Sequence, residues 1–159
     1  MAETEMINCL RYPLREHFLS KAVLALHVVS WFFRLPILLR IHTVPVLLER
    51  LAPSEDGGTG TRMNLDDAVG IVTRACNLRL FRSRLFPKHC LRQSLALYRT
   101  LRRMGYPVQI HFGVIKDEGD FRGHSWVTIG GEAVADTARS GVFKAVYSYP
   151  PAGSVSVFF

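Results

Sequence analysis

Cysteine is scarce in this chain of 159 residues, and the few cysteines present are far apart in the sequence. Cys9, Cys76 and Cys90 are too few and too unevenly spaced for a disulfide framework or a zinc site. The sequence also lacks a glycine-rich phosphate loop and any paired metal-ligand spacing. We therefore expect no cofactor and no metal, and the low cysteine content is typical of a reducing cytoplasm.

A cleavable signal peptide is not recognisable either. The acidic start, with Glu3 and Glu5, has no basic region, and no small-residue cleavage site follows the first apolar run. Internal repeats and low-complexity tracts are missing as well. We therefore expect a cytoplasmic protein, with membrane association as an alternative.

Residues 22–51 are the most hydrophobic part of the chain. Their longest charge-free run extends from residue 22 to residue 33, where Arg34 and then Pro36 interrupt it. Such a run is shorter than the roughly 20 residues that cross a bilayer. We expect two helices hinged near Pro36 that pack over the rest of the protein as additional core. Peripheral membrane contact and a docking surface for a partner are the alternatives.

Basic residues outnumber acidic ones by 20 to 13, which gives a formal net charge of +7. The arginines are scattered along the chain and do not form a stripe with exposed aromatic residues, the pattern typical of nucleic-acid-binding faces. We therefore expect no nucleic-acid partner. An acidic peptide, a partner protein or an anionic membrane surface fits this charge better.

The clearest boundary in the chain is the small, polar, glycine-rich stretch PSEDGGTGTR at residues 53–62. It predicts a helical extension over residues 1–52, a linker over 53–62 and a compact domain over 63–159. Because 48% of the residues are apolar, a sizeable core can form.

Two helices are predicted after this boundary. The first follows an N-cap at Asn64 and has apolar residues at helical spacing up to Cys76, which should therefore be a buried core thiol. The second begins near His89 or Cys90 and ends at Met104. Strands should follow at residues 107–116, 124–129 and 132–136, so we expect an α+β fold.

Three residues of these elements could form the catalytic set of a cysteine hydrolase. Cys90 stands in the first turn of its helix, where the positive end of the helix dipole favours the thiolate. His124 opens a strand and Asp136 ends the next one, so they could serve as base and orienting residue. Each has a structural alternative when taken alone, because a cysteine at a helix start or a histidine at a strand end is often only structural.

The turn between the last two strands decides whether this set can assemble. A two-residue turn at Gly130-Gly131 would place Ser125 opposite Asp136 and direct His124 to the other face. A three-residue or bulged turn would bring His124 and Asp136 to the same face. The catalytic hypothesis therefore predicts an odd-length or bulged turn.

The oxyanion formed during acyl transfer also needs donors. The backbone N–H of Cys90 is the natural first donor, and a second donor is not assigned. Gln93 is expected to be solvated, and His89 is expected to be a cap or loop residue.

At these positions the segments HCLRQSLALYRTLRRMGYPVQIHFGV and GHSWVTIGGEAVAD resemble the leader-peptide-cleaving proteins of bacterial lasso-peptide biosynthesis. Those proteins are similar to the microcin-processing protein's C-terminal domain and to transglutaminase-like cysteine peptidases. The resemblance covers roughly residues 65–136, and the family's catalytic cysteine, histidine and aspartate fall on Cys90, His124 and Asp136. It implies a papain-like core, in which the helix bearing the cysteine packs on a small antiparallel sheet.

Two departures from the family pattern refine this expectation. Thr128 stands where glutamate is common, and the first 60 residues lack the strand pattern of a fused leader-recognition domain. The resemblance then implies a split system, in which a separate leader-binding protein presents the precursor peptide and an ATP-dependent cyclase closes the macrolactam. The alternatives are a non-catalytic peptide- or partner-binding scaffold and a transferase that passes the thioester acyl group to an amine.

Overall fold

The computed structural model describes residues 2–51, 63–82, 86, 88–117, 120–135 and 142–151, with side chains from residue 19 onward. The predicted linker at 53–62 lies outside these residues. The described elements are α1 (Ala2–Ile41), α2 (Val44–Leu51), α3 (Leu65–Cys76), the 3-10 helix η1 (Arg79–Arg82), α4 (His89–Arg103), β1 (Val108–Asp117), β2 (Asp120–Ile129), β3 (Glu132–Val134) and β4 (Lys144–Tyr149).

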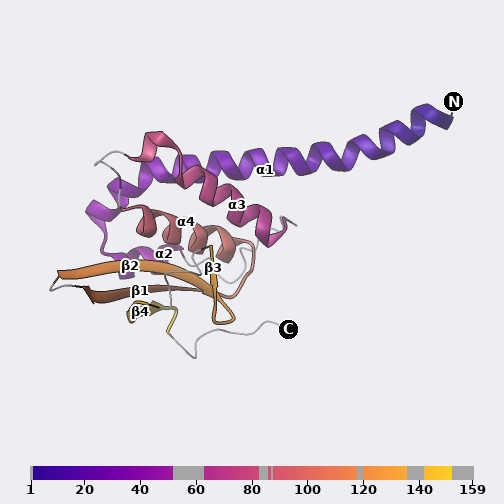
Figure 1. The fold of residues 1–159 in the computed structure, drawn as a ribbon. Helices are drawn as coiled ribbons and strands as arrows, with labels where there is room; N and C mark the ends of the chain where they lie inside the picture. Colours follow the sequence, from indigo (N-terminus) through magenta and orange to yellow (C-terminus); the bar gives the residue numbers. More distant parts are fainter. Residues whose placement is uncertain are drawn as a thin grey trace.

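These elements form layers (Figure 1). The helix α4 packs on β1 and β2, and α1 and α3 pack against α4 and against each other. The N-terminal part of α1 extends away from these layers. The predicted α+β fold, with a helix on a small antiparallel sheet and an apolar N-terminal helix, is confirmed.

The sheet has the strand order β3-β2-β1-β4, and all neighbouring strands are antiparallel. Val108 and Ile110 on β1 and Val127 on β2 lie on one face, where they are buried in the core with residues of α4. Because side chains alternate along a strand, the neighbours of these residues point to the opposite face. β4 extends the sheet beyond the three strands that the sequence predicts, and β2 begins earlier than expected, at Asp120.

The predicted hinge near Pro36 is wrong, because α1 continues through this residue to Ile41. Proline removes one helical hydrogen bond, but Phe32 and Leu35 beside it are fully buried, and this packing holds the helix together. The break comes instead just before α2, in whose first turn Pro45 needs no N–H donor.

The uninterrupted helix also changes the membrane expectation. Residues Leu19–Ile41 form one helix that is long and apolar enough, by length and composition, to cross a membrane. The sequence predicted a shorter apolar run because Arg34 and Pro36 were counted as interruptions, whereas both residues lie within the helix.

One hydrophobic core joins the N-terminal helices to the rest of the fold, as the expectation of additional core required. Val28, Phe32 and Leu35 of α1 and Leu48 of α2 are buried in the same cluster as Leu95 of α4. Burying such side chains contributes about 1.5–3 kcal/mol each. The helices of residues 22–51 are therefore part of the support for α4.

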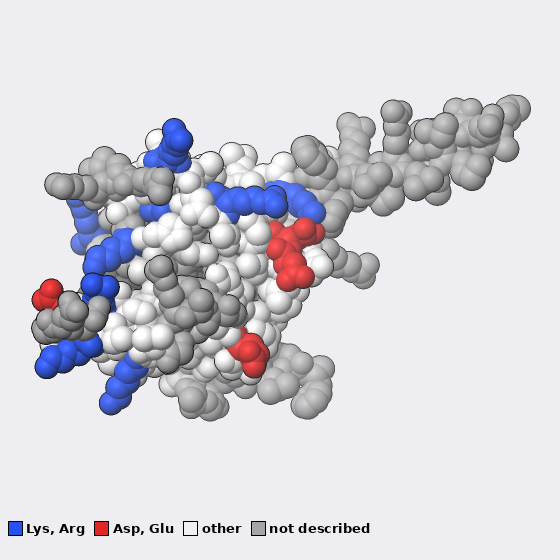
Figure 2. Space-filling model, viewed as in Figure 1, with Lys and Arg blue, Asp and Glu red and all other residues white. Residues whose placement is uncertain are grey.

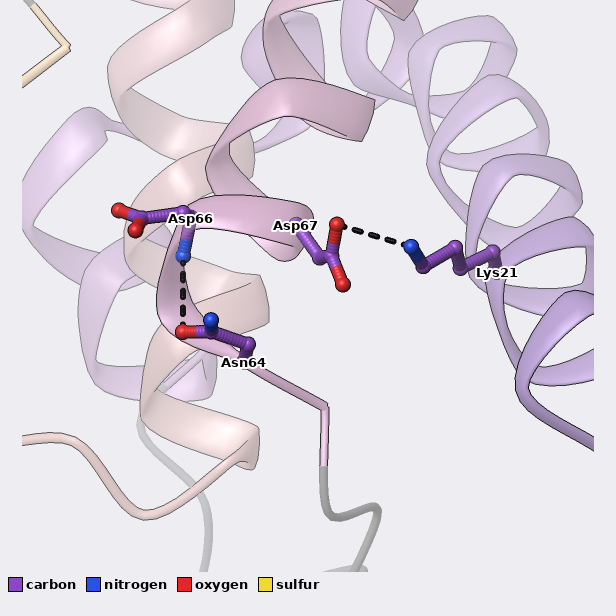
Figure 3. A network of polar contacts seen from close by, with 4 residues as sticks. All are labelled: Lys21, Asn64, Asp66 and Asp67. Atoms are coloured by element: carbon purple, nitrogen blue, oxygen red, sulfur yellow. Dashed lines mark hydrogen bonds and ion pairs between the residues drawn. The ribbon is translucent and has the colours of Figure 1, made fainter. Parts of the chain in front are cut away.

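Polar contacts fix the start of α3 against α1 (Figure 3). The side chain of Asn64 accepts a hydrogen bond from the backbone N–H of Asp66, which confirms the predicted N-cap. Lys21 of α1 forms an ion pair with Asp67 at 2.9 Å. At the other end of α3, Cys76 is fully buried, and burial raises its pKa to about 11, so the prediction of a core thiol is confirmed.

Candidate active site

Cys90 lies in the first turn of α4 and is half-buried. The first helical hydrogen bond of α4 runs from the N–H of Arg92 to the carbonyl of Lys88. The side chain of Lys88 does not cap the helix. The N–H of Cys90 precedes that first bond, so it has no acceptor within the helix.

Two side chains beside Cys90 attach the start of α4 to α3. His89 Nε2 lies 3.1 Å from Oδ1 of Asn77, the residue that ends α3. Gln93 Nε2 donates to Thr73 Oγ1 at 3.3 Å. The expectation that Gln93 is solvated is therefore wrong: it points sideways to α3, so it is not directed at a substrate.

A buried arginine fixes the same end of α4 more strongly. Arg92 is 2% exposed, and its guanidinium donates to the carbonyls of Phe81 at 2.7 Å and Cys76 at 2.8 Å. The guanidinium also lies 5.7 Å from the ring centroids of Phe32 and Phe81. Arg92 thus joins α4, the end of α3 and η1 directly next to the candidate nucleophile.

His124 lies near the middle of β2, between two aromatic side chains. Its ring stacks with Trp126 at a centroid distance of 6.0 Å and contacts Phe143 at 4.9 Å. By strand alternation, His124 and Trp126 share the face opposite to Val127, which packs toward α4. His124 therefore lies on the face of the sheet that is turned away from α4, the helix that carries Cys90.

A hydrogen bond joins α4 to β2. Ser94 follows Cys90 by one helical turn, and its hydroxyl donates to the carbonyl of Ser125 at 2.7 Å. The ladder between β2 and β3 ends at Val127, so β3 does not pair with β2 at Ser125. The structure thereby brings the helix face of Cys90 to the strand position next to His124.

Asp136 lies outside the described residues, so only the approach to it can be reported. The prediction of an odd-length or bulged turn is wrong, because Ile129 pairs with Glu132 across a two-residue turn in which both glycines have positive φ. The pairing ends at Val134, and Ala135 then adopts φ 68°, a left-handed conformation. Regular alternation therefore does not extend from β3 to Asp136.

A second polar group lies on the His124 face of the sheet. His111 stacks on Trp126 at 5.4 Å, and its two ring nitrogens lie 2.7 Å from Ser148 Oγ and 2.8 Å from Thr128 Oγ1. Burial lowers the pKa of His111. Thr128, which stands where glutamate is common in the proteins that the sequence resembles, thus contacts the ring of His111. His111 in turn stacks on the indole of Trp126, which lies beside His124.

Sequence reasoning missed Arg92, Ser94 and Phe143. Arg92 stands three residues before Leu95 on the buried side of α4, and an arginine on an apolar helix face is a signal for a buried cation. Ser94 likewise lies among buried residues of the helix. Phe143 gives no local signal, because its contact with His124 depends on how the chain returns to form β4.

One family model matches most of the chain. A family model described as the transglutaminase-like superfamily matches residues 25–148, which include α4, the sheet and the part of α1 that enters the core. No curated protein and no solved structure gives a significant match. The chain belongs to the transglutaminase-like superfamily.

Proposed function

We propose that this chain is a cysteine peptidase that removes the leader from a lasso-peptide precursor through Cys90, His124 and Asp136. The observation that carries the proposal is the hydrogen bond from Ser94 to Ser125, because it ties the helix of the candidate nucleophile to the strand of the candidate base. Membership of the transglutaminase-like superfamily supports thioester chemistry at a cysteine. The resemblance of residues 65–136 to leader-peptide-cleaving proteins supports a lasso-peptide precursor as the substrate.

The reaction that we propose is acyl transfer to water. His124 takes the proton of the Cys90 thiol, and Sγ forms a bond to the carbonyl carbon at the junction of leader and core. The N–H of Cys90 stabilises the resulting oxyanion. His124 then gives its proton to the leaving amine of the core peptide. His124 then takes a proton from water, whose oxygen attacks the thioester carbonyl; the C–S bond breaks, Cys90 leaves as the thiolate beside protonated His124, and the leader is released with a free carboxylate.

Asp136 would hold the imidazole of His124 through its other ring nitrogen. With the two-residue turn, an unbroken pleat would put Asp136 opposite Ser125. The left-handed Ala135 interrupts that pleat one residue before Asp136. The proposed triad therefore depends on Asp136 lying on the face of His124.

The proposed substrate also implies partners. The first half of the chain supplies helices, so the leader would be presented by a separate leader-binding protein, and an ATP-dependent cyclase would close the ring afterwards. We expect cleavage by the isolated chain to be slow and to rise about tenfold or more when the leader-binding protein is added, which corresponds to roughly 1.4 kcal/mol in transition-state stabilisation.

Cleavage of a precursor peptide by the purified full chain, followed by mass spectrometry with and without the leader-binding protein, tests this proposal. Cys90→Ala should abolish cleavage, whereas Cys76→Ala should retain it. His124→Ala and Asp136→Asn should each reduce it strongly while the thermal melt shows a folded protein.

Other products would replace the proposal with an alternative. A product whose mass includes an added amine would indicate a transferase. Binding of the precursor without turnover, together with an unreactive Cys90, would indicate a scaffold. Equal rates with and without the partner would mean that the chain recognises the leader by itself.

A further inference from the structure

The helix α1 is apolar on two opposite sides. One side packs into the core through residues such as Val28, Phe32 and Leu35. The other side carries large apolar side chains that are 51–71% exposed, which we call the apolar stripe: Leu19, Val23, Leu26, Phe33, Ile37 and Ile41. Phe33 also contacts Phe81 and Phe86, at ring-centroid distances of 5.4 and 6.1 Å, so only part of its ring faces outward.

The apolar stripe extends along the helix from Leu19 to Ile41, with the polar Ser30 between Leu26 and Phe33. Its members recur at intervals of three, four or seven residues, which the repeat of 3.6 residues per turn places on one side of α1. From Leu19 to Ile41 the stripe is about 33 Å long at a rise of 1.5 Å per residue. Only 22% of this apolar segment is buried inside the protein. Exposed apolar area of this extent marks an interaction surface.

Basic side chains accompany the apolar stripe. Arg34 and Arg40 are exposed, and helical spacing places them on its two flanks. Burial, and then the charges of Arg103 and Arg34, lower the pKa of Arg99, so the guanidinium of Arg34 lies near that of Arg99 on α4. None of these four arginines forms an ion pair with a carboxylate among the residues that the structure describes.

A pocket between α1 and α4 continues this surface. Val23 belongs both to the apolar stripe and to the pocket wall. Met63 and Met104 add apolar lining, whereas Arg99 and Arg103 add positive charge. Such a wall suits an amphiphile with an apolar chain and an anionic head. In the view of Figure 2, Lys and Arg side chains are spread widely and acidic ones are confined to a few places.

We propose that the apolar stripe of α1 rests on an anionic membrane surface, with the helix parallel to the bilayer plane. The opposite side of the helix belongs to the core, so α1 cannot cross a bilayer without withdrawing Phe32 and Leu35 from the fold. An in-plane helix with an apolar face and arginines on its flanks gains from both acyl chains and anionic headgroups. This proposal does not depend on the peptidase activity.

The charge on the flanks favours lipid over a second copy of the chain. Two copies docked through their stripes would bring Arg34 and Arg40 of each copy close together without carboxylates to offset them. The stripe is also the outward ridge of a single helix, which suits a flat surface. A membrane surface with anionic headgroups suits both the flanking arginines and the outward ridge of the helix.

Flotation of the full chain with vesicles tests the proposal, using neutral phosphatidylcholine alone or mixed with about one quarter of anionic phosphatidylglycerol. The chain should float with the anionic vesicles and much less with the neutral ones. The double change Leu26→Ser and Ile37→Ser should weaken vesicle binding about tenfold or more. Arg34→Gln and Arg40→Gln should each weaken it about fivefold and reduce its salt dependence.

Phe121→Ser is the matched control, because Phe121 is 74% exposed but lies in the β1-β2 hairpin. It should bind vesicles as the unchanged chain does, and Cys90→Ala should do so as well. Binding that the stripe changes do not affect, or equal binding to neutral vesicles, would overturn the proposal. The proposal would also be overturned if the chain did not float and instead formed dimers, and if the changes in the apolar stripe dissociated those dimers.

Discussion

The hydroxyl of Ser94 and the backbone carbonyl of Ser125 are joined by a hydrogen bond of 2.7 Å between α4 and β2. Both serines are nearly fully buried, at 3% and 4% exposed. One lies a helical turn after Cys90, and the other lies directly after His124. The bond therefore fixes the position of α4 relative to β2 close to the two proposed catalytic residues.

Ser94→Ala should lower leader cleavage about tenfold to a hundredfold, because small displacements of reacting groups have effects of this size. The free energy of unfolding should fall by about 1 kcal/mol. Cleavage kinetics and urea melts measure the two effects. Thr73→Ala, which removes the weaker bond to Gln93, should affect cleavage far less; equal losses in both variants would contradict the role of Ser94.

Arg92→Lys should reduce the free energy of unfolding by about 2–4 kcal/mol. An ammonium cannot reach both buried carbonyls in the forked geometry of a guanidinium, and an unsatisfied buried carbonyl is costly. Chemical denaturation measures the loss. Arg74→Lys, at an exposed position of α3, is the control and should hardly change the free energy of unfolding. The prediction fails if the two variants unfold alike.

Gly113→Ala should destabilise the sheet by about 1–3 kcal/mol, as overpacking does. A Cβ at this position would lie 2.8 Å from the ring atoms of Trp126 and 2.9 Å from the carbonyl oxygen of Lys144. Tryptophan fluorescence and thermal melts should both change. Gly123→Ala on β2 meets its nearest atom only at 3.9 Å and should be tolerated. Unchanged fluorescence in Gly113→Ala would refute the close packing.

Thiol labelling should separate the cysteines. Iodoacetamide near neutral pH should modify Cys90 and leave Cys76 intact, because Cys76 is buried with a pKa of about 11 and holds very little thiolate. Mass mapping after a short reaction shows which thiol is labelled. Fast labelling of Cys76 or Cys9 in place of Cys90 would be incompatible with the assignment of Cys90 as the nucleophile.

The stability of the protein should decrease as the pH falls below about 6.5, the ordinary pKa of histidine. Burial lowers the pKa of His111 in the folded state, so the unfolded chain binds its proton first. The contribution of His111 is fully present above that pH and is lost as the pH falls toward the lowered folded-state pKa. Urea melts across this range should show a smaller decrease for His111→Gln; an unchanged decrease would exclude His111 as its source.

Local patterns predicted the elements that carry the site. The apolar spacing in α3 and α4, the cap at Asn64 and the alternation of β1 each depend on a few neighbouring residues, and the structure reproduces them. The burial of Cys76 followed from the same helical spacing. The first-turn position of Cys90 followed from the predicted start of this helix near His89 or Cys90.

Features set by distant contacts could not be predicted in this way. Helix α1 continues through Pro36 because the core packs around it, which a local proline rule does not include. The turn at Gly130-Gly131 is tight, and the departure from regular pairing comes later, at Ala135. The contact of Phe143 with His124 requires the return of the chain to β4. In each case the deciding partner is far away in sequence.

The core contacts of α1 also set an order of events during synthesis. Phe32 packs on Phe81, and Trp31 lies under the guanidinium of Arg99, so both partners of α1 leave the ribosome long after α1 itself. Until then the nascent helix presents apolar side chains on both of its sides, a state prone to aggregation. When the second half of the chain folds, it covers only one of these two sides, so the apolar stripe stays exposed after folding is complete.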